Sequence, residues 1–169
     1  MQNEIIDNYS KVEGFFISDC GVMFVRQDTK LQKELSLASL LRVIEKINRD
    51  MLVEGYMLTT SIAYGGFSYY PRIEFIGIEK NPIYGDAYVK AFIDNEGGHR
   101  KIEPGQCRIL KEQNLQNLNL EGFPAFNKLI EDKHYYNYYW MVNDAFQIGR
   151  FNEEFKNAYN LKYRGMLST

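Results

Sequence analysis

The sequence predicts an α+β domain, an antiparallel sheet with helices packed on one face, as in ferredoxin-like folds. Short apolar runs typical of strands come in pairs, and a segment with helical spacing of apolar residues follows each pair. The sequence contains no repeat, low-complexity tract or long linker. We therefore expect one domain over residues 1–169, with a core over residues 12–142 and a helical tail over residues 151–164.

A hairpin is expected near the start of the chain. Val12–Ile17 and Val22–Val25 are apolar runs with strand character. Ser18-Asp19-Cys20-Gly21 stands between them and has the composition of a turn. We expect the two runs to pair in antiparallel fashion, with Asp19 at the tip.

The longest helix is expected next. From Leu37 to Leu52, apolar residues recur at spacings of three and four, which places them on one helical face. Ser36 stands where an N-cap would, and Gly55 stands just beyond the expected end of the helix.

The rest of the chain is expected to be arranged around the stretch from residue 58 to residue 92. Met57–Tyr64 reads as a buried strand that ends at Gly65-Gly66, where the lack of a Cβ permits a turn or a close approach to a ligand. Ile73–Ile78 reads as a second strand, and Asn81-Pro82 breaks the chain after it. Asp86 then predicts the N-cap of a helix that ends near Gly97-Gly98.

The remaining segments are shorter. Gln106–Leu110 predicts a strand, and residues 111–121 predict an irregular connection. Phe123–Asp132 favours a helix, whereas the aromatic segment of residues 134–142 favours a strand. Its rings either stack on a base or belong to a strand with one face buried and the other covered by a second chain, and we favour the second interpretation.

Composition limits the classes of function. The chain is 45% hydrophobic with a net charge of −2, so charge favours neither nucleic acid nor an anionic membrane as a partner. No apolar run approaches membrane-spanning length, and the first residues lack the pattern of a signal peptide. Cys20 and Cys107 form neither a disulfide framework nor a metal-binding spacing, and His99 and His134 lack partners at ligand spacing. We expect a soluble cytoplasmic protein.

Three segments, in order, carry a resemblance to a known family. FFISDCGVMF, SIAYG…YGDAYVKAF and EPGQCRIL together resemble the homology domain of class III nucleotide cyclases, the adenylate and guanylate cyclases. They resemble most a divergent bacterial branch that includes the pyrimidine cyclases of anti-phage signalling. The resemblance covers roughly residues 12–110. It implies a ferredoxin-like sheet and formation of a 3′,5′-cyclic nucleotide from a nucleoside triphosphate.

The resemblance also implies a site. Family members hold two Mg²⁺ or Mn²⁺ ions with two aspartates, and Asp19 matches one of them. Asp19 is equally explained as a turn residue. The implied nucleotide-binding positions are Ser18, Cys20, Gly21, Gly65 and Gly66. Family active sites lie between two domains packed head to tail, so a homodimer is expected.

Several positions depart from the family pattern. Phe15 and Pro82 stand where purine cyclases select the base. Val89 and Ile93 stand where an Asn and an Arg stabilise the transition state, and neither side chain can donate a hydrogen bond. Eleven residues precede Val12, too few for the family's first strand with the second metal-binding aspartate. Either the 169 residues are part of a longer protein, or the family's first strand has been lost. Two functions stay open, a cyclase with a different substrate and a non-catalytic binding or dimerisation module.

Overall fold

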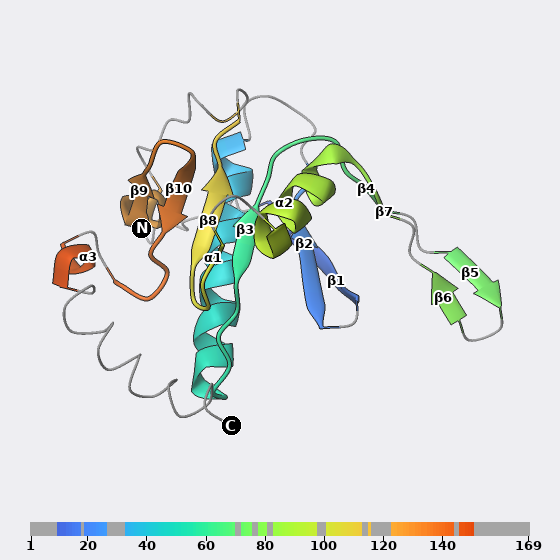
Figure 1. Cartoon of the computed structure of the whole chain (residues 1–169), viewed down its shortest axis with the longest axis horizontal. Helices are drawn as coiled ribbons and strands as arrows, with labels where there is room; N and C mark the ends of the chain where they lie inside the picture. The colour runs from blue at the N-terminus through green and yellow to red at the C-terminus, as the bar shows by residue number, and fades with distance from the viewer. Residues whose placement is uncertain are drawn as a thin grey trace, which may run out of the picture. The chain divides into compact units, whose positions relative to one another are not determined.

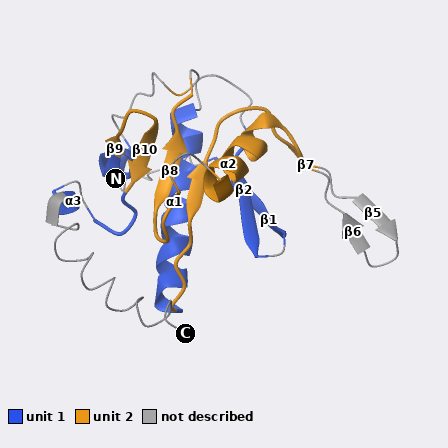
Figure 2. Cartoon of the chain, viewed as in Figure 1, with its two compact units in different colours: residues 1–54, 118–129, 139–169 blue, residues 55–117, 130–138 orange. Residues whose placement is uncertain are grey.

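A computed structural model describes residues 10–17, 19–26, 33–69, 72–75, 78–80, 83–97, 101–112, 115, 123–143 and 146–150 (Figure 1). These residues form an α+β protein, which confirms the predicted class. The chain groups into two compact units, coloured in Figure 2. Unit 1 contains residues 1–54, 118–129 and 139–169, and unit 2 contains residues 55–117 and 130–138.

Unit 1 begins with the predicted hairpin. Strand β1 (Glu13–Ile17) pairs antiparallel with β2 (Cys20–Phe24). Ile17 lies opposite Cys20, so Asp19 belongs to the tight turn that joins the strands. The rings of Phe15 and Phe24 pack on one another across the pair, with their centroids 6.2 Å apart. The prediction of a hairpin with Asp19 at its tip is confirmed.

Helix α1 (Lys33–Val53) is the longest element of unit 1. Its buried apolar side chains recur at helical spacing, as predicted, and Gly55 follows its end with φ of +88°. The prediction that Ser36 is the N-cap is wrong, because the helix begins three residues earlier, at Lys33. Ser36 is instead buried within the helix, where its hydroxyl lies 3.4 Å from that of Ser10.

The predicted helix over residues 123–132 is also wrong. A short 3₁₀ helix, η3 (Pro124–Lys128), is followed directly by strand β9 (Leu129–Glu131). Pro124 suits the first turn of a helix, but pairing of β9 with the next strand prevents the helix from continuing. Tertiary pairing therefore overrides the local helical pattern.

Unit 2 is built on a four-stranded sheet in the order β3-β8-β10-β9. Strand β3 (Thr60–Ile62) pairs parallel with β8 (Cys107–Leu110), and β8 pairs antiparallel with β10 (Tyr135–Tyr138). The sheet is therefore mixed, and the prediction of a wholly antiparallel sheet is wrong. Helix α2 (Asp86–Gly97) lies in the connection between β3 and β8 and packs beside β3 (Figure 1). Such a crossover returns the chain to the end of the sheet at which β3 starts, so β3 and β8 run parallel.

A two-stranded ribbon separates β3 from α2. Strand β4 (Ser68–Tyr69) pairs with β7 (Ile83–Tyr84), and β5 (Arg72–Phe75) pairs with β6 (Ile78–Lys80). The single strand predicted over residues 73–78 is thus two strands paired with each other. The strand predicted over residues 57–64 contracts to β3.

The aromatic segment is largely covered by this chain itself. Tyr136 and Tyr138 of β10 are buried, and so is Trp140, which lies in a turn after the strand. The guanidinium carbon of Arg108 lies 4.3 Å from the centre of the Tyr135 ring. These rings therefore give no reason to expect a second chain. Helix α3 (Gln147–Arg150) ends the described part, and the predicted helix over residues 151–164 lies outside it.

Candidate functional site

The hairpin tip presents the predicted metal ligand. Asp19 is exposed in the turn, and the thiol of the exposed Cys20 lies 3.8 Å from its carboxylate. Ser18 lies outside the described residues. Within the described ranges, no group of three or more His, Cys, Asp or Glu side chains is placed to hold a metal ion. One carboxylate suits Mg²⁺ only when waters and substrate phosphates complete the coordination shell.

Gly21 has a structural explanation in the hairpin. It lies opposite Phe16, and a Cβ built on it would come within 3.3 Å of the Phe16 ring. The glycine therefore leaves room for an aromatic ring on the strand surface.

The two glycines after β3 contact the start of α2 and are both in unit 2. The Gly66 amide donates to the Asp86 carboxylate at 2.7 Å, and the Ala87 amide donates to the Gly66 carbonyl at 3.3 Å. A Cβ on Gly65 would lie 2.7 Å from the same carboxylate. Gly85 has φ of +133°, and its Cβ would overlap the Gly66 carbonyl oxygen. These glycines therefore permit a close backbone contact.

The contact adds a partner to the predicted role of Asp86. Its carboxylate binds the Gly66 amide across the loop, whereas a simple N-cap was predicted. The nucleotide-binding role of Gly65 and Gly66 stays a prediction. Gly65 and Gly66 belong to unit 2, whereas Asp19 and Gly21 belong to unit 1.

Lys90 links the loop contact to the segment that follows β8. Its ammonium group donates to Asp86 at 2.7 Å and to Glu112 at 3.0 Å. The hydrogen bond from Lys90, followed by that from Gly66, holds the pKa of Asp86 below its ordinary value of 3.8. The hydrogen bond to Asp86, followed by that to Glu112, raises the pKa of Lys90. Both groups therefore stay charged across the physiological range.

A buried polar cluster joins α2 to the sheet of unit 2. Asp94 and Arg108 form a bidentate ion pair with distances of 2.8 Å, and each side chain is 4% exposed. The Ser61 hydroxyl donates to the same carboxylate at 2.6 Å. Ser61 and Arg108 are also cross-strand neighbours on β3 and β8. The cluster therefore sets how β3, β8 and α2 meet.

Helix α2 carries an exposed apolar face. Val89, Phe92 and Ile93 are 50%, 48% and 56% exposed, and their spacing of three and four places them side by side. The Tyr88 ring stacks on Phe92, with centroids 6.0 Å apart. We call Val89, Phe92 and Ile93 the α2 face. Exposed apolar residues gathered on one helix face mark an interaction surface more often than scattered ones do.

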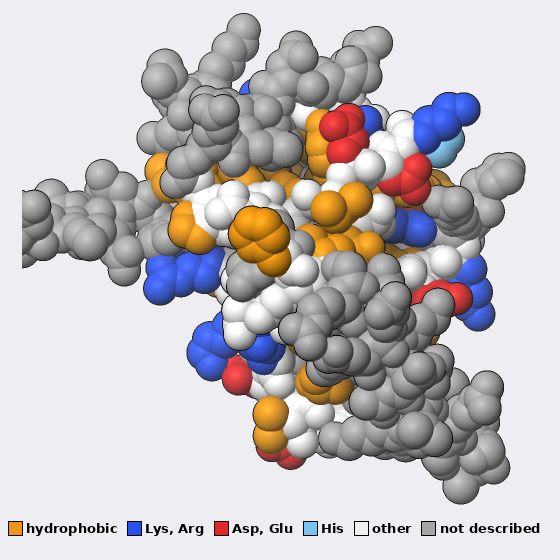
Figure 3. Space-filling model, turned by 90° about the vertical axis from the view of Figure 1, so that its left-hand side faces the viewer, with side chains coloured by type: hydrophobic (Ala, Val, Ile, Leu, Met, Phe, Trp, Pro, Cys, Tyr) orange, Lys and Arg blue, Asp and Glu red, His pale blue; other side chains and the backbone are white. Residues whose placement is uncertain are grey.

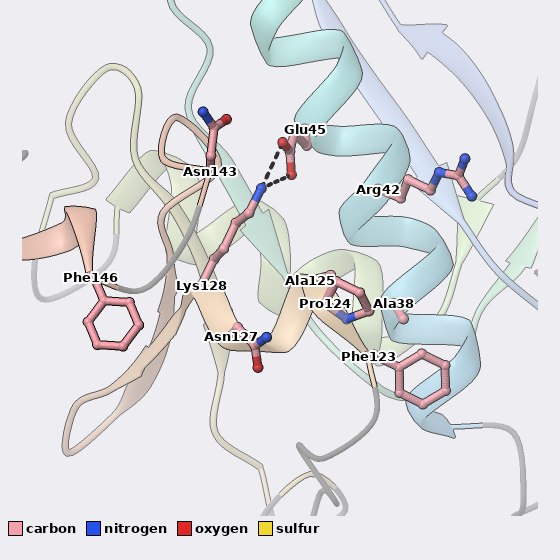
Figure 4. A pocket seen from close by; sticks show the side chains of 10 residues that line it. All are labelled: Ala38, Arg42, Glu45, Phe123, Pro124, Ala125, Asn127, Lys128, Asn143 and Phe146. Atoms are coloured by element: carbon pink, nitrogen blue, oxygen red, sulfur yellow. Dashed lines mark hydrogen bonds and ion pairs between the residues drawn. The ribbon is translucent and has the colours of Figure 1, made fainter.

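A hollow of about 600 Å³ opens in unit 1 among α1, η3 and the loop before α3 (Figure 4). The Lys128 ammonium group donates to both Glu45 carboxylate oxygens at 2.8 Å. Arg49 donates to Glu45 at 3.1 Å and reaches the carbonyl of Met141 at 3.3 Å. The hollow is therefore lined in part by a carboxylate shared between two cations.

Other surface features are less specific. Where the described residues can be seen in Figure 3, exposed hydrophobic side chains lie among acidic and basic ones. Burial raises the pKa of the Cys107 thiol far above its ordinary value, so this cysteine is unreactive. No helix among the described residues has the length and apolar character needed to span a bilayer.

Three features of the structure were not predicted from the sequence: the buried Asp94–Arg108 ion pair, the α2 face and the hollow of unit 1. The Asp94–Arg108 pair had one signal, an arginine inside the apolar strand Cys107–Leu110. The α2 face had a clearer signal in the spacing of Val89, Phe92 and Ile93. The hollow had none, because its residues come from three separated segments.

Comparisons of the chain with protein-family models, with curated proteins and with solved structures find no match. Function is therefore inferred from the geometry of the described residues and from the three cyclase-like segments.

Proposed function

We propose that this chain is a nucleotide-cyclase-like domain that works as a homodimerisation module, with the α2 face as the pairing surface. The observation that carries the proposal is the exposure of Val89, Phe92 and Ile93 on one side of α2. Water around such a face is released when an equivalent apolar surface covers it, and this release favours association.

The resemblance identifies the second copy as the partner. In the cyclases that the chain resembles, the helix positions matching Val89 and Ile93 carry active-site residues, and the active site lies between two paired domains. Here those positions hold aliphatic side chains. The α2 face would then still pair two copies of the domain, as in the cyclases, but it would lack the polar side chains that catalyse cyclisation.

A two-fold symmetric dimer needs only one pairing surface on each chain. In a two-fold dimer the same patch is used on both subunits, so the α2 face of one copy would cover that of the other. Tyr88, stacked on Phe92, would extend the contact with an aromatic ring, a residue type enriched at interfaces.

Light scattering coupled to size exclusion tests the proposal. We expect a mass about twice the 19.8 kDa of one chain at micromolar concentration, falling on dilution if the dimer is weak. A mass of one chain at every concentration up to the solubility limit would refute the dimer.

Nucleotide cyclisation is the second candidate, and the exposure of Asp19 at the hairpin tip favours it. A carboxylate there is free of steric cover and could bind Mg²⁺ or Mn²⁺ with a nucleoside triphosphate. The metal would polarise the phosphate and lower the pKa of the attacking hydroxyl group. The chain's own contribution would be to hold the metal through Asp19.

An activity assay separates the two candidates. We expect no cyclic nucleotide from ATP or GTP with Mn²⁺ above the level of an Asp19→Ala control, because Phe15, Pro82, Val89 and Ile93 replace the purine-cyclase residues. CTP and UTP belong in the same assay, since the resemblance extends to pyrimidine cyclases. Product that disappears in Asp19→Ala would establish the enzyme in place of the module.

A further inference from the structure

We infer that the hollow of unit 1 binds a small organic anion with an apolar or aromatic body. This site is independent of the α2 face and of Asp19. Its volume of about 600 Å³ falls within the range of small-molecule sites, roughly 300–1,000 Å³. Half of its ten lining residues are apolar and half are polar or charged, so both kinds of surface are available to a ligand.

The charge around the hollow favours an anion. Glu45 is a single carboxylate, yet both Lys128 and Arg49 donate to it. Within the described contacts, two positive charges thus share the Glu45 carboxylate, and the Lys128 side chain is only 11% exposed. A cation with little access to water gains more from a nearby anion than an exposed one does.

Lys128 also has the geometry to hold a ligand. The Lys128 nitrogen donates to both oxygens of Glu45, and an ammonium group carries three hydrogens. Its remaining donor capacity suits a carboxylate or phosphate oxygen in the hollow. The side-chain amide of Asn143, which lines the hollow near this pair, supplies a further donor (Figure 4).

The apolar part of the lining fits the body of the ligand. Phe123, Pro124 and Ala38 line the hollow near the starts of η3 and α1, whereas Lys128 and Glu45 lie farther along these two elements (Figure 4). A ligand with its anionic group at Lys128 would place its body against these side chains. Separation of charged and apolar surfaces within one site selects an amphipathic molecule over a bare ion.

Amide chemical shifts in ¹H–¹⁵N NMR spectra of the full chain test the site. The probes are phenyl phosphate, benzoate, benzyl alcohol and inorganic phosphate. We expect saturable shifts around Ala125–Lys128 and Asn143 with phenyl phosphate or benzoate, and at least fivefold weaker binding of the other two. The tighter of the two aromatic anions identifies the preferred head group. Benzyl alcohol or inorganic phosphate binding as tightly as both aromatic anions would overturn the inference.

A charge variant localises the binding. Replacing Lys128 would leave Glu45 without a buried partner, so the charge is better changed at Asn127, an exposed residue of the lining. We expect Asn127→Asp to weaken the aromatic anion at least fivefold, and Asn127→Gln to change it less than twofold. Unfolding curves of both variants check that they fold. Equal affinity of folded Asn127→Asp and the parent chain, or saturable shifts confined to other regions, would contradict the site.

Discussion

Asp94 of α2 and Arg108 of β8 form a bidentate ion pair in which both side chains are 4% exposed. Arg108 also donates to the backbone carbonyl of Asp94 at 3.0 Å, and its guanidinium lies over the Tyr135 ring. One side chain therefore contacts a helix and a neighbouring strand. Removing either charge would leave the other without compensation in the core.

Asp94→Asn is expected to destabilise the fold strongly. Asparagine has the same shape but no charge, so Arg108 would stay buried and unpaired. Loss of one partner of a buried pair costs about 3–5 kcal/mol in free energy of unfolding. Urea denaturation measures this cost.

The matched control is Asp50→Asn. Asp50 pairs with Lys46 at 2.6 Å, but both side chains of that pair are exposed. The same substitution should cost less than about 1 kcal/mol there. Equal losses for the two variants would show that the Asp94–Arg108 pair does not stabilise the core.

Gly85→Ala is expected to weaken the junction between the Gly65-Gly66 loop and α2. The residue has φ of +133°, and a Cβ would overlap the Gly66 carbonyl oxygen. Backbone strain of this kind costs on the order of 1–3 kcal/mol, and relief of the overlap adds to it. Gly97→Ala, at the far end of α2, is the control because a Cβ there meets no atom within 4 Å. A thermal midpoint for Gly85→Ala as high as that of Gly97→Ala would contradict the contact.

Acid should weaken the same junction. The folded-state pKa of Asp86 lies below its ordinary value of 3.8, so the unfolded chain binds this proton more readily. The stabilisation is complete above the ordinary value and is lost as the pH falls through the folded value. Between roughly pH 5 and pH 2, the parent chain should therefore lose stability more steeply than Asp86→Asn. Parallel curves of unfolding free energy against pH would rule out this role.

The hairpin and the buried face of α1 were predicted correctly because each depends on residues that are close together in the sequence. The hairpin β1–β2 follows from two apolar runs around a turn, and the spacing of apolar residues in α1 predicts its buried face. The start of α1 was misplaced because Ser36 is also suited to burial beside Ser10, which no local rule reveals. The mixed sheet followed from a long-range event, the return of the chain through α2 to pair β8 with β3.

The site residues show the same division. A turn composition predicted the exposed position of Asp19, and the glycine pair at Gly65-Gly66 predicted a turn or a close approach to a ligand, where the structure has a close approach to another part of the chain. The partner in that approach is Asp86, twenty residues away, which the sequence marked only as a helix cap. Lys128 and Glu45 are farther apart still. Contacts between distant segments depend on the whole fold, so local spacing does not contain them.

Sedimentation velocity of Val89→Lys against Val53→Lys tests the central claim, pairing through the α2 face, most directly. Val53 is 82% exposed at the end of α1, outside the α2 face, so the same substitution there controls for added charge. We predict a dimer for the parent chain and Val53→Lys, and a monomer of 19.8 kDa for folded Val89→Lys at the same concentration. A folded Val89→Lys that dimerises like Val53→Lys, or a parent chain that stays monomeric, would contradict the claim.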